Sequence, residues 1–358
     1  MPVIFTVELM TLLTPLPVFD GHNDLLLKLW LEHPDDPVAA FYSRVENGHL
    51  DFARMKRGGF FGGLFAVFIP PASYIAQMRN QTEEQALASY DPLAITEAQI
   101  AIMYQLEQAS EGRLRICRTV SEIEYCQRHQ LIAAVLHIEG AGALDAELTR
   151  LDRFYDWGVR SIGPFWNLPN AFGEGVSGPF PASPDSGAGL TQAGKALIRA
   201  CNQRRIMIDV SHMNEKAFWD TAALSDAPLV ATHSNAHTLC PQPRNLTDAQ
   251  LETIAQRNGF VGVNFGTAFL RADGKRDSAT TSLTEIVKHI EFLIAKLGED
   301  HVGFGSDFDG VDIPQQLGDV SGLPRLMQAL SQAGFDDRLL EKLAWRNWLR
   351  TLAASWRE

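Results

Sequence analysis

Hydrophobic positions along the chain follow two alternating patterns. Short runs rich in β-branched and aromatic residues are separated by longer amphipathic segments with helical spacing. The runs are nearly continuous in apolar residues, as in strands that are covered on both faces. The expected strands are Val18–Asp24, Phe60–Ile69, Ile132–Glu139, Val159–Phe165, Ile206–His212, Leu229–His233, Phe260–Phe265 and Val302–Asp307. Eight strands alternating with helices predict an α/β fold, specifically a (β/α)8 barrel of the TIM type.

Start signals mark several of the expected helices. Ser282–Glu285 and Thr247–Gln250 have the sequence of a capping box, and each is followed by a helical segment that ends near a glycine. The same spacing of apolar residues predicts helices over Leu190–Arg204 and Arg338–Trp356.

The chain is expected to form a single domain over residues 1–358, because no polar linker or internal repeat divides it. Two stretches exceed what a minimal barrel needs. These are residues 31–57, after the first strand, and residues 166–190, which are rich in Gly, Pro and Ser. Long strand-to-helix loops lie at the catalytic face of such barrels, so both are expected as insertions beside a site.

The composition excludes some functions. A net charge of −12 disfavours a surface that binds nucleic acid. The four cysteines form no CxxC pair and are expected as buried free thiols. The apolar N-terminus lacks a basic region and contains Glu8, so it is not expected to be a signal peptide. The stretch at Gly58–Ile69 is too short to span a bilayer. A cytoplasmic protein with no membrane partner is therefore expected.

Metal-binding residue types gather at the carboxyl ends of the expected strands, where a barrel collects its catalytic groups. They are His22, Asp24, Glu139, His212, His233 and Asp307. Acidic groups buried together would repel one another without a cation, and three histidines with carboxylates suit zinc. The sequence therefore predicts a metal centre at this end of the barrel.

The other polar residues near these positions are expected to be structural. His137 lies two residues before Glu139 and is expected one layer deeper in the interior. Asp20 either orients a ligand or serves the fold. His237 is a weak ligand candidate. The histidines expected in solvent are His33, His49, His129, His289 and His301.

The strand ends belong to six longer motifs. These are FDGHNDLL (Phe19–Leu26), HIEGAGAL (His137–Leu144), IDVSHMN (Ile208–Asn214), THSNAH (Thr232–His237), PRNLTD (Pro243–Asp248) and GFGSDFDG (Gly303–Gly310). In this order they resemble the renal, or membrane, dipeptidase family of the amidohydrolase superfamily. The resemblance continues to RNWLR at Arg346–Arg350 and so covers nearly the whole chain.

The resemblance implies a metallopeptidase that hydrolyses dipeptides with two zinc ions per chain. His22 and Asp24 would hold one ion, His212 and His233 the other, and Glu139 would bridge both. Paired cations that share a water lower its pKa, which provides a hydroxide to attack the amide carbonyl. Glu139 is therefore a candidate catalytic residue as well as a ligand.

The resemblance also implies contacts to the substrate. Asp307 would be the unligated acid that passes the proton of the water to the leaving amine. Arg244 would pair with the terminal carboxylate of the substrate, for which a guanidinium fork is well shaped, unless it is only a surface charge. Asn245, beside it, is a weaker candidate.

One position departs from the family pattern. Characterised eukaryotic members carry a histidine after the fourth strand that stabilises the oxyanion, whereas this chain has Trp166 at the nearest position. An indole N–H can donate one hydrogen bond but carries no charge. The alternatives are that Asn167 or Asn170 takes this role, or that Trp166 only packs.

Two other functions therefore stay open. Because the histidine is missing, the protein could instead be a related binuclear metallohydrolase that acts on another amide, an ester or a lactone. A non-catalytic metal-dependent binder is disfavoured, because binding alone needs no proton shuttle of the Asp307 type. The expected partner is a small dipeptide, the resemblance implies tolerance of a D-residue at its C-terminal position, and a homodimer is left open.

Overall fold

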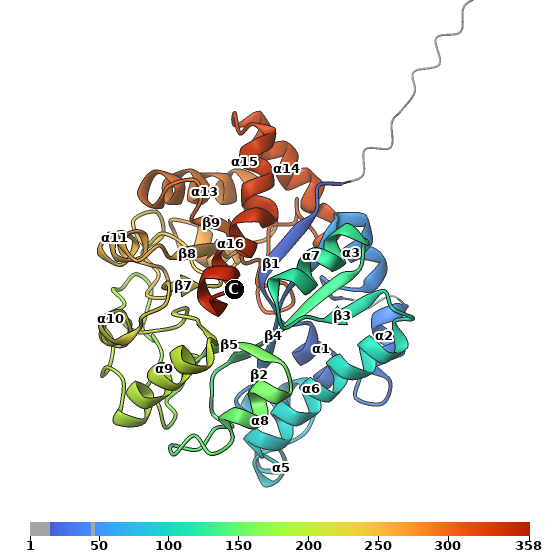
Figure 1. Ribbon diagram of the computed structural model, residues 1–358, viewed down its shortest axis with the longest axis vertical. Helices are drawn as coiled ribbons and strands as arrows, with labels where there is room; N and C mark the ends of the chain where they lie inside the picture. Colours follow the sequence, from blue (N-terminus) through green and yellow to red (C-terminus); the bar gives the residue numbers. More distant parts are fainter. Residues whose placement is uncertain (1–14, 44–46) are drawn as a thin grey trace, which may run out of the picture.

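The computed structural model describes residues 15–43 and 47–358. In this part of the chain the strands form two parallel sheets that lie inside a ring of helices (Figure 1). The strands are β1 (Val18–Asn23), β2 (Phe60–Phe68), β3 (Leu114–Ile116), β4 (Ile132–Glu139), β5 (Val159–Gly163), β6 (Met207–Ile208), β7 (Val230–Ala231), β8 (Phe260–Val263) and β9 (Val302–Phe304).

At least one helix separates each pair of successive strands, as the sequence predicts. The helices are α1 (Leu25–Glu32), α2 (Pro37–Tyr42), α3 (Phe52–Gly58), α4 (Ala72–Met78), α5 (Glu83–Ala88), α6 (Pro92–Ala109), α7 (Val120–Arg128), α8 (Leu151–Asp156), α9 (Gln192–Arg204), α10 (Glu215–Leu224), α11 (Asp248–Gln256), α12 (Thr267–Leu270), α13 (Leu283–Leu297), α14 (Leu323–Gln332), α15 (Asp337–Glu341) and α16 (Asn347–Trp356). A short 3-10 helix, η1 (Val320–Gly322), precedes α14, and a π-helical turn, η2 (Lys342–Arg346), joins α15 to α16.

The first sheet has the order β1-β2-β4-β5-β6, with β3 on the beginning of β4, and the second has the order β7-β8-β9. All of these strand pairs are parallel. Isolated parallel bridges lie where the sheets meet, from Asp209 to Val230 and from Asn23 to Phe308. The structure therefore has the predicted α/β class, with a curled parallel sheet that gathers its carboxyl strand ends on one side.

All eight expected strands are present, and each ends at the expected residue or up to four residues before it. The sequence missed β3, because its three residues are too short to show a period. The capping box at Thr247 is confirmed. The one expected at Ser282 is wrong: this hydroxyl pairs with the hydroxyl of Thr284, a nearer partner, and makes no cap.

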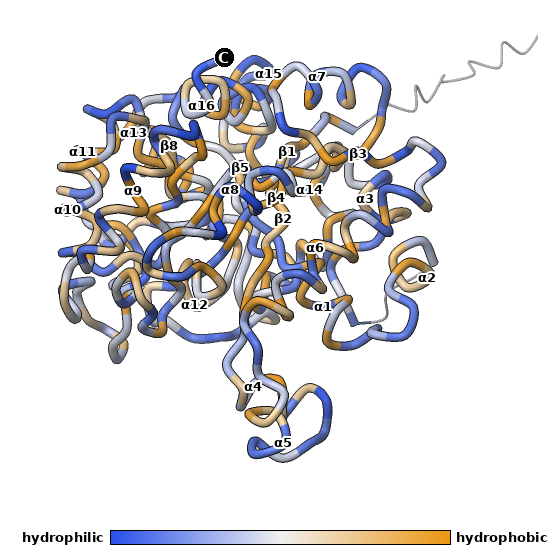
Figure 2. Tube along the Cα trace, turned by 60° about the horizontal axis from the view of Figure 1, so that its bottom comes forward, coloured by the Kyte–Doolittle hydropathy of each residue, from blue (hydrophilic) through white to orange (hydrophobic). Residues whose placement is uncertain are grey.

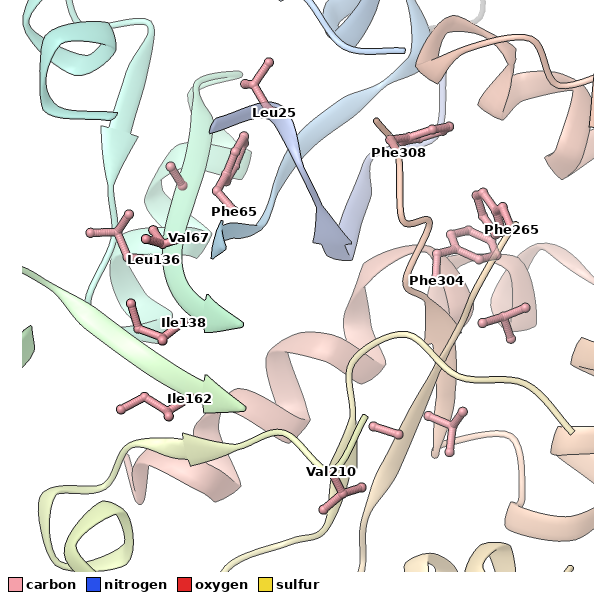
Figure 3. Packing of buried hydrophobic residues seen from close by; sticks show 14 of the residues in the cluster. Leu25, Phe65, Val67, Leu136, Ile138, Ile162, Val210, Phe265, Phe304 and Phe308 are labelled. Carbon is pink, nitrogen blue, oxygen red and sulfur yellow. The ribbon is translucent and has the colours of Figure 1, made fainter. Parts of the chain in front are cut away.

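The core consists of apolar side chains that successive strands and loops present to one another. In Figure 3, Val67 on β2 lies near Leu136 and Ile138 on β4, with Ile162 on β5 beyond them. Each of these residues is at most 1% exposed. Burying such a side chain contributes about 1.5–3 kcal/mol, so the sheet provides a rigid frame for the polar groups at its end.

The C-terminal helix covers the opposite end of the strands. Trp348 on α16 packs against Phe260, the first residue of β8, with ring centroids 4.2 Å apart, and against Phe19 near the start of β1. Its indole N–H donates a hydrogen bond to the carbonyl of Phe304 at 2.8 Å. The RNWLR segment therefore seals the amino ends of the strands and leaves the carboxyl ends for the site.

Several segments extend the frame. Residues 31–57 contain α2 and α3, with residues 44–46 outside the described part, and residues 166–190 contain no helix or strand. An arm that the sequence did not predict, with α4 and α5, projects from the body (Figure 2).

Three other expectations concern the chain as a whole. All four cysteines are buried free thiols, as expected. None of the described helices is long and apolar enough to cross a membrane. The expectation that the N-terminus is no signal peptide falls largely on residues 1–14, outside the described residues.

Candidate metal centre

Six polar side chains converge at the carboxyl ends of the strands. Each lies in a strand, at its end or a few residues beyond it, and each residue is at most 8% exposed. They are His22 in β1, Asp24 directly after β1, Glu139 at the end of β4, His212 after β6, His233 after β7 and Asp307 after β9. The structure thus brings together the residues that the sequence singled out.

The backbone turns sharply at two of these positions. His212 and Asp307 have φ angles of 66° and 60°, in the left-handed region that residues with a side chain rarely adopt. Such conformations cost about 1–3 kcal/mol each and persist where the surrounding structure enforces them. Here they direct both side chains inward from the strand ends.

The carboxylate of Glu139 separates two groups of nitrogen and oxygen atoms. Its Oε2 lies 3.4 Å from Nε2 of His22, and this nitrogen is 3.6 Å from Oδ2 of Asp24. Its Oε1 lies 2.9 Å from Nε2 of His212 and 3.6 Å from Nε2 of His233. Each group offers three ligand atoms within 4.8 Å of one another, and Glu139 belongs to both.

The chemistry of these groups fits a cation. His22 is completely buried, and neither of its ring nitrogens has a hydrogen-bond partner among the described residues. Buried polar atoms without partners are costly, so the ring is poised for a ligand bond. Asp307 offers a further oxygen within 4.8 Å of the ligand atoms of His22 and His233. Three imidazoles with carboxylates in a buried cluster are typical of zinc sites.

Electrostatics favours the metal-binding forms of several ligands. Burial, together with the positive charge of Arg244, lowers the pKa of His212 to about 4, and burial holds the pKa of His233 well below its usual value. Burial acts to raise the pKa of Glu139, but the charge of His22 and the hydrogen bond from His212 hold it well below its usual range. Neutral His212 and His233 and an ionised Glu139 are the states that bind a metal. Burial acts to lower the pKa of His22, but the charges of Glu139 and Asp24 hold it well above its usual value, so a cation would have to displace a proton from this ring.

A cavity of about 590 Å³ opens above this cluster. One part of its wall is polar and includes Asp24, Glu139, His212, Arg244 and Asp307. The apolar part includes Leu27, Phe68, Pro71, Tyr74, Trp166, Val176, Pro243, Phe269 and Val311. This combination of an apolar wall with a few convergent polar groups is what a small-molecule site requires.

Arg244 lies in this wall and is not the surface charge of the alternative interpretation. Its side chain is buried, and Nη1 donates to the hydroxyl of Ser234 at 2.7 Å while Nη2 donates to the carbonyl of His233 at 2.9 Å. Its Nε lies 3.1 Å from Nδ1 of His212. These contacts aim the guanidinium at the metal cluster and leave one N–H on each of Nη1 and Nη2.

The structure separates the remaining candidates. Trp166 lines the cavity, and its ring packs against that of Phe68 with centroids 5.2 Å apart. Asn167 lies beside it, with Oδ1 2.8 Å from Nδ1 of His212. Asn170 and Asn245 are not among the residues that line the cavity: the side-chain nitrogen of each donates to main-chain carbonyls.

His137 and Asp20 have structural contacts, as expected, whereas the expectation that His289 lies in solvent is wrong. His137 is buried below His22, with ring centroids 5.4 Å apart, and Asp20 accepts two hydrogen bonds from Ser306. His289, expected in solvent, is 1% exposed, because it lies on the apolar stripe of α13 and bonds to Ala236 and to the carbonyl of Leu270.

Asn264 contacts the site but was not among the candidate residues identified from the sequence. Asn264, just after β8, donates a hydrogen bond from Nδ2 to Oδ2 of Asp307 at 2.7 Å. Its position at the end of an expected strand, shared with the metal-type residues, is the signal that could have identified it.

Comparisons with known proteins agree with this geometry. The family profile of the membrane dipeptidases, peptidase family M19, matches residues 7–355. A Klebsiella pneumoniae protein described only by its place in the pqqA 5' region is 59% identical over 75% of this chain and 98% of its own length. The dipeptidase verJ of Clonostachys rogersoniana is 29% identical over 95% of this chain and 84% of its own.

A solved structure shares the fold. The metallopeptidase of Rhodobacter sphaeroides, crystallised with a phosphinate mimic of the dipeptide L-Ala-D-Ala, is 44% identical. It superimposes with a TM-score of 0.89 over 96% of this chain and 100% of its own. With a profile match over nearly the whole chain, the protein belongs to the membrane dipeptidase family, peptidase family M19, and is a metallopeptidase.

Proposed function

We propose that this metallopeptidase hydrolyses dipeptides at a centre of two zinc ions. The observation that carries the proposal is the position of Glu139, whose two carboxylate oxygens face two separate groups of ligand atoms. His22 and Asp24 would hold one ion, His212 and His233 the other, and Glu139 both. When bound, the ions would supply an activated water and polarise the amide carbonyl.

Asp307 would carry the proton between the water and the leaving amine. Asn264 donates a hydrogen bond to Oδ2 and so fixes the carboxylate in the cavity wall, which leaves Oδ1 for the reaction. Burial raises the pKa of Asp307, although the charge of His22 opposes this shift. A carboxyl whose pKa moves toward neutrality both accepts and returns a proton more readily.

Arg244 would bind the terminal carboxylate of the dipeptide. With a cation bound, Nε2 of His212 would be its ligand atom, so Nδ1 would carry the ring proton and donate to Asn167 rather than accept from Arg244. The guanidinium then has Nε and two further N–H groups for a carboxylate. Amidated dipeptides should accordingly be poor substrates, and equal rates on amidated and free forms would remove this role from Arg244.

The substrate range proposed includes dipeptides with a D-residue at the C-terminal position. The supporting observation is the Rhodobacter sphaeroides relative, which was crystallised with a mimic of L-Ala-D-Ala.

The rival function is hydrolysis of another amide, an ester or a lactone, since Trp166 stands where a histidine was expected. A screen of L,L and L,D dipeptide libraries, with esters and lactones as controls, distinguishes them. Turnover of only the controls would refute the dipeptidase.

We also propose that residues 1–358 form one (β/α)8 barrel domain with insertions at residues 31–57 and 166–190. The two bridges, Asp209 to Val230 and Asn23 to Phe308, support closure of the barrel between the sheets. The loop at residues 166–190 contributes Trp166, Asn167 and Val176 to the cavity wall, as expected for an insertion at the catalytic face.

A further inference from the structure

A continuous chain of hydrogen bonds runs below His233, on the side away from the cavity. Nδ1 of His233 lies 2.7 Å from Oγ1 of Thr232, and this hydroxyl lies 2.6 Å from Oδ2 of Asp209. All three residues are at most 1% exposed. No part of the proposed mechanism uses Thr232 or Asp209, yet both are directly connected to a candidate ligand.

The directions of these hydrogen bonds follow from the number of protons. Oδ1 of Asp209 accepts hydrogen bonds from the main-chain N–H groups of Ser211 and Thr232, both at 2.9 Å, so the carboxylate acts as an acceptor. The hydroxyl of Thr232 has one proton, which it donates to Oδ2 of Asp209. It can therefore only accept from His233, and Nδ1 of His233 must carry the ring proton.

This assignment leaves the lone pair of His233 on Nε2, the atom that faces the cluster. Nε2 of His233 is 3.0 Å from Nε2 of His212 and 3.6 Å from Oε1 of Glu139. A neutral imidazole binds a metal only through its unprotonated nitrogen, and the partner of the other nitrogen decides which one that is.

We propose that Asp209 and Thr232 are positioning residues that fix the tautomer of His233 and so set the affinity for the cation held by His212 and His233. The proposal rests on the metal centre proposed above. The hydroxyl links the carboxylate to the imidazole, where many metal sites place the carboxylate directly on the ring. His212 has a different partner, the amide of Asn167 on the loop after β5, so the two imidazoles are oriented independently.

One neighbouring group also faces the carboxylate. Nε2 of His137 lies 3.5 Å from Oδ2 of Asp209, at the limit of a hydrogen bond, while its Nδ1 bonds to the hydroxyl of Ser161 at 2.9 Å. The bond of 2.6 Å from Thr232 is far shorter, so the carboxylate is engaged mainly with the chain to His233.

Three variants test the chain. Thr232→Val keeps the shape and removes the hydroxyl, whereas Thr232→Ser keeps the hydroxyl. In Asp209→Asn an amide N–H would donate to Thr232, which turns the hydroxyl proton toward His233 and moves the ring proton to Nε2. Thr351→Val is the matched control, because Thr351 is also buried and its hydroxyl bonds to Asn347 and Arg350 of its own helix, α16, at the opposite end of the fold.

The measurements are zinc dissociation constants, from competition with a chromophoric chelator, and the tautomer of His233, from ¹⁵N NMR of protein labelled at histidine. We expect Thr232→Val and Asp209→Asn to raise the dissociation constant of one of the two zinc ions by about 10- to 100-fold, with a smaller change for the other ion. Thr232→Ser and Thr351→Val should stay within about 3-fold of the parent protein. The metal-free parent protein should show the Nδ1–H tautomer at His233.

Each outcome bears on the proposal. Unchanged zinc binding in Thr232→Val and Asp209→Asn would overturn it, as would an Nε2–H tautomer in the parent protein, a measurement that needs no folded variant. A loss in Thr232→Ser as large as in Thr232→Val would also overturn it. Absence of a zinc pair in the parent protein would instead refute the proposed function, so the two failures are distinguishable.

Discussion

Replacing His289 with glutamine should flatten the pH dependence of stability in weakly acidic solution. Nδ1 of His289 accepts a hydrogen bond from the main-chain N–H of Ala236 at 3.2 Å, and Nε2–H donates to the carbonyl of Leu270 at 3.0 Å. Together these bonds require a neutral ring. They also tie α13 to the segment that follows His233, so protonation should loosen the wall of the site.

The magnitude follows from the shift in pKa. Burial lowers the pKa of His289 to about 4 from the usual 6.5. Because the folded value is the lower one, the unfolded chain binds the extra proton between these two values. The contribution of neutral His289 to stability is therefore fully present above its pKa in the unfolded chain. It is lost as the pH falls toward its pKa in the folded protein. From about pH 7 to about pH 5 one such group lowers the free energy of unfolding by about 2 kcal/mol.

Urea unfolding of both proteins at these two pH values, with equal zinc content, provides the test. Glutamine does not titrate, and its amide keeps a donor for Leu270, so His289→Gln should be less stable at neutral pH but lose less on acidification. The parent protein should lose about 2 kcal/mol more than the variant between the two conditions. Equal losses would show that His289 is not held neutral by the fold.

Three substitutions at the site give further predictions. Glu139→Gln replaces one ligand oxygen with an amide nitrogen that has no available lone pair. At least one zinc ion should therefore bind about 100-fold more weakly, as measured by chelator competition. Two tightly bound ions in this variant would contradict the prediction. Asp307→Asn should lower kcat by about 10²- to 10⁴-fold with zinc retained, and a smaller loss would remove the proton-transfer role. Trp166→Phe should change kcat/KM by less than about 10-fold if the indole only packs on Phe68, whereas a loss above about 100-fold would make its N–H the oxyanion donor.

The site could be predicted from the sequence where chemistry is local to a strand end. Glu139 and His233 each end an apolar run, His22 lies near the end of β1, and parallel strands bring such ends to the same edge. The direction of a side chain beyond the strand was harder to predict. Arg244 and Asn245 are neighbours in one turn, yet one enters the cavity wall and the other bonds to main-chain carbonyls of the fold.

Other features could not be predicted from the sequence, because tertiary contacts determine them. The left-handed backbone at His212 and Asp307 is enforced by the surroundings, and nothing in their residue types demands it. The burial of His289 could have been predicted, since it stands three residues after Ile286 and four before Leu293 on the same helix face. The projecting arm with α4 and α5 has no distinctive pattern that separates it from an ordinary helical connection.

The two-ion centre around Glu139 is most directly tested by anomalous X-ray scattering from crystals of the zinc-loaded protein. We expect two peaks, one in contact with His22 and Asp24 and the other with His212 and His233, both touching the carboxylate of Glu139. A single peak, or peaks away from Glu139, would contradict the proposed centre.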